Sequence, residues 1–124
     1  MRVLLDTQAF IVAYAGALPP EVDRIIVGPE NEWVLSAVSL AELAVKYAVG
    51  KLDMPLNETL RALRDLNVTT LPFEARHAFA MFSLPLHHRD PFDRMILATA
   101  VAEKLPIVTG DRIFRRYSEV KVIW

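Results

Sequence analysis

Val3-Leu4-Leu5-Asp6 is a short apolar run that ends on a carboxylate, and Pro106-Ile107-Val108-Thr109-Gly110-Asp111 repeats this pattern near the other end of the chain. Short apolar runs bounded by turn residues predict buried strands. The carboxyl ends of parallel strands lie at one edge of a sheet, where α/β proteins bind their ligands. Asp6 and Asp111 are therefore predicted to lie near one another at that edge.

Predicted strands and helices alternate along the whole chain. Strands are expected near residues 2–6, 33–36, 68–71, 106–109 and 120–124. Helices are expected at 7–16, after Pro19-Pro20, at 39–49, after an N-cap at Asn57, at 74–84 and at 91–103, with a short helical turn near 112–116. This alternation predicts an α/β fold with a central parallel sheet between helical layers, and residues 1–124 are expected to form one domain.

The composition restricts the class of protein. The chain has 124 residues, of which 53% are hydrophobic, enough for one buried core. It has no cysteine, which excludes disulfides and thiolate chemistry. No apolar stretch reaches the roughly 20 residues that span a bilayer, and Asp6 comes too early for a signal peptide. We therefore expect a cytoplasmic protein without a membrane partner.

Two further acids, Glu42 and Asp93, stand near the starts of predicted helices. If strand and helix alternate, these helices begin at the same sheet edge as Asp6 and Asp111. Four carboxylates in one half-buried cleft repel each other unless cations neutralise them. Oxygen ligands without cysteine favour Mg²⁺ or Mn²⁺ over Zn²⁺.

The charge balance is compatible with a phosphate ligand only when metal is bound. The chain has 14 basic and 15 acidic residues, a net charge of −1, which alone argues against a nucleic-acid binder. Without the four candidate ligands, 11 acids remain against 14 bases, so the rest of the chain carries about +3. Divalent cations would offset the four acids and allow a weak attraction for phosphate.

Each acid also has a purely structural interpretation. Ser39-Leu40-Ala41-Glu42 fits a capping box, and Glu42 and Lys46 form a favourable i, i+4 pair. In Asp90-Pro91-Phe92-Asp93, Asp90 is the better N-cap, whereas Asp93 lies on an apolar helix face and needs a partner. Asp6 and Asp111 can each cap the helix that follows.

Other polar and aromatic residues give weaker signals. His87-His88-Arg89 could contact a phosphate backbone, but loop histidines are more often solvated, and no companion residues have the spacing of a zinc site. Arg112, Arg115 and Arg116 form a basic patch that fits substrate contact or simple solvation. Trp33 and Trp124 lie in or beside predicted strands, which favours packing in the core or in a dimer.

Four segments together resemble a known family: LLDTQAF around Asp6, LSAVSLAELAVKYAVGKL around Glu42, HHRDPFDRMILATA around Asp93 and IVTGDRIF around Asp111. They are similar to the PIN-domain ribonucleases, and most similar to the VapC toxins of toxin–antitoxin pairs. The resemblance covers the whole chain, including the closing aromatic residue. It implies a three-layer α/β/α PIN-like fold with the family's acids at Asp6, Glu42, Asp93 and Asp111. Asp90 matches an additional acid, and Thr109 matches a small hydroxyl residue before the last one.

The resemblance also implies an activity and partners. The chain is expected to be a Mg²⁺- or Mn²⁺-dependent endoribonuclease that hydrolyses RNA phosphodiesters with water as the nucleophile. Asp6 and Asp93 would be the central metal ligands, Glu42 a ligand or water-orienting base, and Asp111 and Asp90 supporting acids. Substrate contacts are assigned to Lys46, Thr109 and Arg112. As the toxin of a type II pair, the chain would form a homodimer and bind a small VapB-like antitoxin.

Two competing hypotheses remain. A non-catalytic PIN-fold module that binds RNA or protein would keep the same acids, and only metal-dependent cleavage separates it from the nuclease. An aspartyl-phosphate phosphotransferase also places an aspartate after an apolar strand. That class usually has an aspartate or threonine two positions later, where this chain has Gln8.

Overall fold

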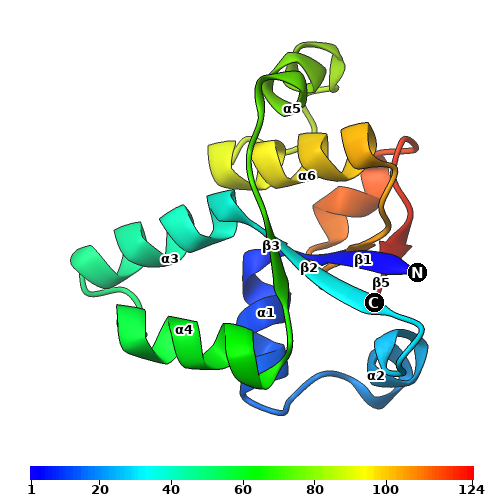
Figure 1. Cartoon of the computed structure of the whole chain (residues 1–124). Coiled ribbons are helices and arrows are strands. Elements are labelled where there is room, and N and C mark those ends of the chain that lie inside the picture. Colours follow the sequence, from blue (N-terminus) through cyan, green and yellow to red (C-terminus); the bar gives the residue numbers. More distant parts are fainter.

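A computed structural model describes all of residues 1–124, which form a five-stranded parallel sheet with helices on both faces (Figure 1). The strands are β1 (Arg2–Leu5), β2 (Glu32–Ser36), β3 (Thr69–Leu71), β4 (Ile107–Val108) and β5 (Val122–Ile123). The helices are α1 (Thr7–Tyr14), α2 (Pro20–Ile26), α3 (Ala37–Ala48), α4 (Leu56–Asp65), α5 (Ala75–Ala80) and α6 (Pro91–Glu103), and the 3₁₀ turns are η1 (Met81–Ser83) and η2 (Arg112–Arg116). The predicted α/β class and parallel sheet are confirmed.

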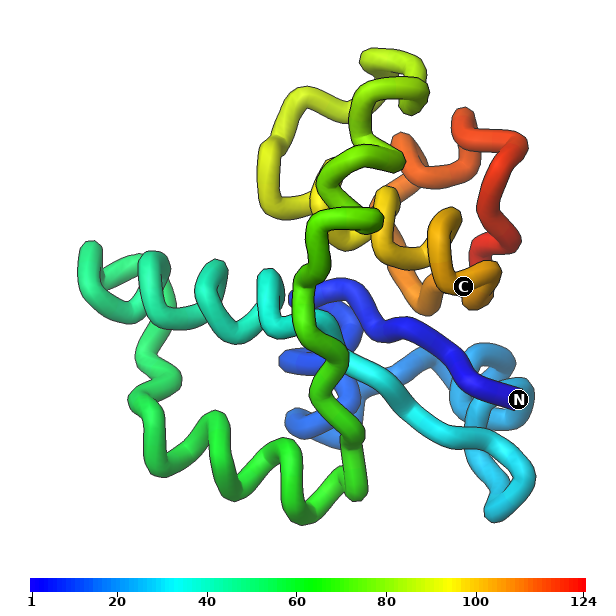
Figure 2. Tube along the Cα trace, turned by 45° about the horizontal axis from the view of Figure 1, so that its top comes forward, coloured from blue at the N-terminus to red at the C-terminus, as the bar shows by residue number.

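The strand order is β3-β2-β1-β4-β5, so β1 is the central strand, with β2 and β3 on one side and β4 and β5 on the other. All four pairings are parallel, with Leu5 opposite Leu35 of β2 and Val108 of β4. In the trace of Figure 2, the orange and red C-terminal segment lies on one side of β1 and the cyan β2 on the other. The order reverses at the crevice between β1 and β4, which is where open α/β sheets bind ligands.

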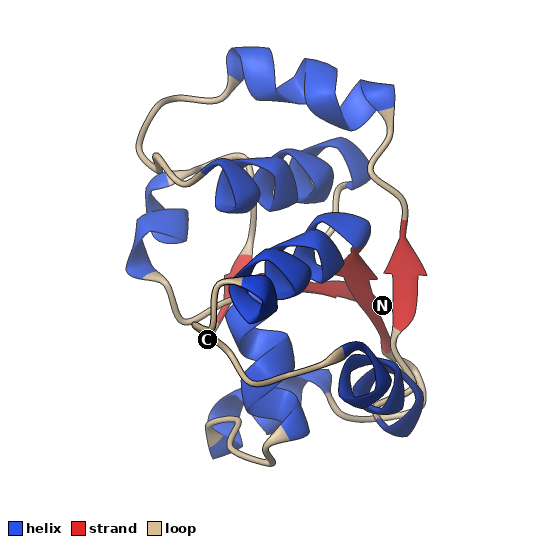
Figure 3. Ribbon diagram, turned by 90° about the vertical axis from the view of Figure 1, so that its left-hand side faces the viewer, coloured by secondary structure: helices blue, strands red, loops and turns tan.

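The central strand β1 is buried from both sides and separates two hydrophobic clusters. Val3 and Leu5 belong to the cluster that α1, α2 and α4 cover, whereas Leu4 belongs to the cluster beneath α6 and η2. This follows from the period-2 alternation of side chains along a strand. Figure 3 shows blue helices around the red strands, one of which lies at the outer edge of the molecule. Together these features give the three-layer arrangement that the sequence predicts.

Several predicted boundaries were wrong by a few residues. Helix α3 begins at Ala37, not Ser39, because Ser36 caps it by accepting a hydrogen bond from the Val38 amide at 3.0 Å. Helix α4 begins at Leu56 rather than after Asn57, because the Pro55 carbonyl already accepts the first helical hydrogen bond from the Thr59 amide. The predicted 74–84 helix ends at Ala80 and continues as the 3₁₀ turn η1.

No helix has the length and hydropathy needed to cross a membrane.

The two-cluster core generates a stability prediction. Phe10 of α1 is fully buried, so Phe10→Ala should destabilise the protein by about 3 to 5 kcal/mol through lost burial and a residual cavity. Phe82 of η1 is 91% exposed, and Phe82→Ala should change the unfolding free energy by no more than about 0.5 kcal/mol. Chemical denaturation of both variants checks this; equal losses would contradict the described core.

Candidate metal centre

Five carboxylates line one cleft of about 460 Å³ at the carboxyl edge of the sheet. The complete lining consists of Asp6, Thr7, Gln8, Val12, Glu42, Lys46, Asp90, Asp93, Gly110, Asp111 and Trp124. The structure therefore brings together all four predicted acids and also Asp90. Lys46 is the only basic residue of this lining, which leaves an excess of four carboxylates when every acid is ionised.

Three of these acids are helix caps and cleft residues at once. Asp6 Oδ1 accepts from the Ala9 amide at 2.7 Å, and Asp111 Oδ1 accepts from the Ile113 amide at 3.0 Å. Asp90 Oδ1 accepts from the amides of Phe92 and Asp93 at the start of α6. In each case the cap uses Oδ1, so the structural and functional interpretations of these acids are compatible.

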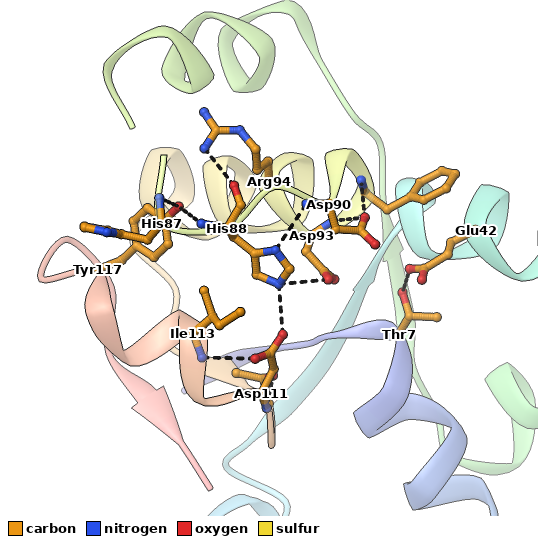
Figure 4. A network of polar contacts seen from close by, with 12 residues as sticks. Thr7, Glu42, His87, His88, Asp90, Asp93, Arg94, Asp111, Ile113 and Tyr117 are labelled. Atoms are coloured by element: carbon orange, nitrogen blue, oxygen red, sulfur yellow. Dashed lines mark hydrogen bonds and ion pairs between the residues drawn. The ribbon is translucent and has the colours of Figure 1, made fainter. Parts of the chain in front are cut away.

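Glu42 does not form the capping box that its spacing with Ser39 suggests. Because α3 begins at Ala37, Glu42 lies one turn further into the helix and is only 4% exposed. Its Oε1 lies 2.5 Å from Thr7 Oγ1, and its Oε2 lies 2.8 Å from Lys46 Nζ. A carboxylate can only accept, so the Thr7 hydroxyl donates to Glu42. This contact ties the start of α1 to α3 across the cleft (Figure 4).

Burial and neighbouring negative charge raise the pKa of two of these acids, Asp93 and Asp6. The pKa of Asp93 is raised to about 7, chiefly by burial and also by the charges of Asp90, Glu42 and Asp6, while His88 opposes the shift. Burial also raises the pKa of Asp6, against the lowering effect of hydrogen bonds from Thr109 and the Ala9 amide. The pKa of Lys46 is raised, chiefly by its hydrogen bond to Glu42. The cleft therefore favours positive charge.

His88 is the residue that sequence reasoning placed wrongly, because it is buried and not solvated. Its Nε2 lies 2.8 Å from Asp111 Oδ2 and 3.1 Å from Asp93 Oδ2 (Figure 4). The three ligand atoms lie within 4.8 Å of one another, so His88 does have companions, although none has zinc-site spacing in the sequence.

The hydrogen bonds of His88 define its role. The Asp90 amide can only donate, so His88 Nδ1 accepts this hydrogen bond at 3.3 Å and carries no proton. The proton is then on Nε2, which donates toward Asp111 and Asp93. In this arrangement His88 positions these two carboxylates.

The remaining candidate residues have distinct positions. Thr109 is buried; its hydroxyl accepts from the Asp111 amide at 3.0 Å, and its side chain lowers the pKa of Asp6, so it interacts with both acids. Lys46 lines the cleft, whereas Arg112 is exposed beside Asp111 and outside the lining. Their contacts with substrate stay predictions.

The two tryptophans differ in their surroundings. Trp33 packs against the core and donates to the Ile26 carbonyl at 2.8 Å, as expected for a packing residue. Trp124 instead lines the acidic cleft and is 39% exposed, so the prediction of core packing was wrong for this residue, and packing in a dimer stays a prediction. Its sequence position after a strand could not show that it lies next to Gly110.

The fold and the acidic cleft define a PIN-type α/β domain, and a profile of the PIN domain matches residues 3–120. The chain belongs to the PIN domain family. A search of curated proteins gave no match.

Solved structures are similar over nearly the whole chain. One is VapBC2 from Rickettsia felis bound to a DNA fragment from its promoter, with a TM-score of 0.74 and 21% identity, covering 98% of this chain and 97% of that one. Another is VapBC-5 from Mycobacterium tuberculosis, a member of the VapBC family of toxin-antitoxin systems, with a TM-score of 0.66, 24% identity and coverage of 98% and 97%. At this identity the similarity establishes the fold.

The raised pKa of Asp93 predicts how the metal-free protein responds to pH. The folded-state pKa of about 7 exceeds the usual 3.8, so the folded protein holds this proton more tightly than the unfolded chain. Its contribution to stability therefore falls as pH rises from about 4 to 7 and stays low above that. In EDTA, Asp93→Asn should melt close to wild type at pH 4 and above it at pH 8.

Asp53→Asn is the matched control, because Asp53 is exposed and outside the cleft. Its melting temperature relative to wild type should not change between the two pH values. A stabilisation by Asp93→Asn that is the same at pH 4 and pH 8 would contradict the raised pKa.

Proposed function

We propose that this chain is a Mg²⁺- or Mn²⁺-dependent endoribonuclease and the toxin of a type II toxin–antitoxin pair. The observation that carries the proposal is the convergence of five carboxylates on one cleft with a single lysine. PIN-family membership and the VapBC folds support the same assignment.

The donor set of the cleft fits a divalent cation. Carboxylate oxygens are the ligands of Mg²⁺ and Mn²⁺, and the raised pKa values of Asp6 and Asp93 express the cost of leaving these charges uncompensated. Asp6, Glu42 and Asp93 would hold the ion, with Asp111 and Asp90 in support. When bound, such an ion lowers the pKa of water and neutralises phosphate charge.

Neighbouring side chains orient the acids, and Lys46 adds a positive charge to the cleft. Thr7 and Lys46 fix the two oxygens of Glu42, which leaves further lone pairs to orient water. His88 and the η2 cap fix both oxygens of Asp111. Lys46, whose side chain is 41% exposed, can contact the phosphate of an RNA strand while it remains paired with Glu42. No side-chain nucleophile is needed.

The direct test is cleavage by purified protein. Wild type should cleave single-stranded RNA with Mg²⁺ or Mn²⁺ and not with EDTA, and Asp6→Asn should lose activity by at least about a hundredfold because it removes a central charge from the cleft. Asp53→Asn should keep wild-type activity. Wild-type turnover by Asp6→Asn would refute the assignment; metal-independent RNA binding without cleavage would favour the non-catalytic module.

The proposed antitoxin has a docking surface on the opposite side of α3. A groove of about 230 Å³ between α3 and α4 is lined almost wholly by apolar side chains, namely Leu40, Leu43, Ala44, Tyr47, Met54, Leu56, Leu60 and Leu63, together with Thr59. Leu56 and Leu60 are more than half exposed, which indicates a surface that a partner covers. A basic side chain of that partner could pair with the cleft acids. We include homodimer formation in this proposal.

A charged residue introduced into this groove should weaken binding of the antitoxin without changing RNA cleavage. Leu60→Asp should bind the small protein encoded beside this chain at least about tenfold more weakly, because it buries a carboxylate against apolar side chains. Its RNA cleavage should be unchanged. Ile25→Asp, at an exposed position of α2, is the control and should bind like wild type. Equal affinity of all three proteins would contradict the groove assignment.

A further inference from the structure

We propose that the indole of Trp124 is a stacking platform for a nucleobase of the RNA strand whose phosphate lies at the acids; this inference rests on the proposed function. It adds an uncharged subsite to a cleft otherwise dominated by carboxylates. Base stacking on an exposed aromatic ring is the chemistry by which proteins hold single strands without reading their sequence.

The first support is the position of Trp124. Trp124 and Val12 are the only apolar residues of the cleft lining, and Trp124 as a residue is 39% exposed. The other large side chains at this end of the chain, Phe114, Tyr117 and Ile123, are buried in the two core clusters. Trp124 therefore exposes aromatic surface beside the acids that neither core cluster uses.

The second support is the orientation of the ring against Gly110. A Cβ added to Gly110 would lie 2.8 Å from Trp124 Cε2, 3.0 Å from Cζ2 and 3.1 Å from Nε1. If this Cβ lay in the plane of the indole and outside the ring, it would be closer to Cζ2 and Nε1, which flank Cε2, than to Cε2. The order of the three distances is the reverse. The Gly110 position therefore lies over one face of the indole. A side chain at 110 would displace the ring, and glycine allows the ring to lie flat on the backbone next to Asp111.

The third support is the rigid attachment of the residue. Ile123 is buried, and its carbonyl accepts from the Thr109 amide at 3.2 Å, while Arg115 donates to the Trp124 carbonyl at 3.3 Å. These two hydrogen bonds hold the backbone of Ile123 and Trp124 against β4 and η2. A pre-organised aromatic side chain loses little conformational entropy on binding, which favours stacking.

The sheet sets the reach of the platform. At the carboxyl edge, β5 lies two strands from β1, so Trp124 is separated from Asp6 by roughly 10 Å at the usual strand spacing. That is the scale of one nucleotide. A base attached at or next to the scissile phosphate can therefore reach the indole, while the uncompensated acids between them repel every phosphate that no cation neutralises.

Two tests use Trp33→Phe as the background, which leaves Trp124 as the single tryptophan. In the first, single-stranded RNA is added with Mg²⁺, and the fluorescence of Trp124 should be quenched. In the second, KM for a short RNA that wild type cleaves is measured. Trp124→Ala should raise KM by about tenfold with a smaller effect on kcat, whereas Trp124→Phe should stay within about threefold.

Abasic substitution identifies the stacked base. When one base at a time is removed from the RNA, wild-type protein should bind the RNA much more weakly if the missing base is the one beside the scissile bond. RNA binding by Trp124→Ala should not change when that base is removed. A merely structural role of Trp124 would give equal losses at every position. Melting temperatures of the variants confirm that they are folded.

The outcomes separate this inference from the proposed function. Cleavage with an unchanged KM in Trp124→Ala overturns the stacking platform and leaves the nuclease intact. Quenching by RNA without cleavage supports the platform and overturns the nuclease. If the protein neither binds nor cleaves RNA, both the platform and the nuclease proposal are overturned. A concentration-dependent change of Trp124 emission without any response to RNA would assign the indole to an interface between copies and also overturn the platform.

Discussion

Mutual repulsion among half-buried carboxylates is the constraint on which the rest of this structure depends. Asp6 and Asp93 both have raised pKa values, and the causes include burial and the charges of neighbouring acids. The fold must hold such a cluster in place, and either protons or cations can compensate its charge. The β1–β4 crevice, the cap hydrogen bonds and the contacts of Thr7, Lys46 and His88 together fix it.

The same acids begin the helices that surround the cleft. Asp6, Asp90 and Asp111 each cap a helical segment, which satisfies free amides and also places a carboxylate at the positive end of a helix. Local folding energy therefore holds the acids at one sheet edge. This explains why each of them has both a good structural and a good functional interpretation.

Much of the site could be predicted because its local signals agree. Asp6 and Asp111 follow apolar runs, and Asp90-Pro91 marks a helix start, so their placement needs only strand and cap rules. The contacts of Glu42 could not be predicted, because they depend on Ser36 rather than Ser39 beginning α3 and on Thr7 of another helix. His88 and Trp124 were misplaced because only tertiary packing brings them to Asp93 and Gly110.

The central claim is that these carboxylates form one divalent-cation site, and titration with Mn²⁺ followed by electron paramagnetic resonance tests it most directly. We predict saturable binding by wild type, with competition by Mg²⁺, and a loss of at least about tenfold in affinity when Glu42 is replaced by Gln. The matched replacement Glu58→Gln, on α4 outside the cleft, should leave binding unchanged. Absence of saturable Mn²⁺ binding, or equal affinity in the Glu42→Gln variant, would contradict the account.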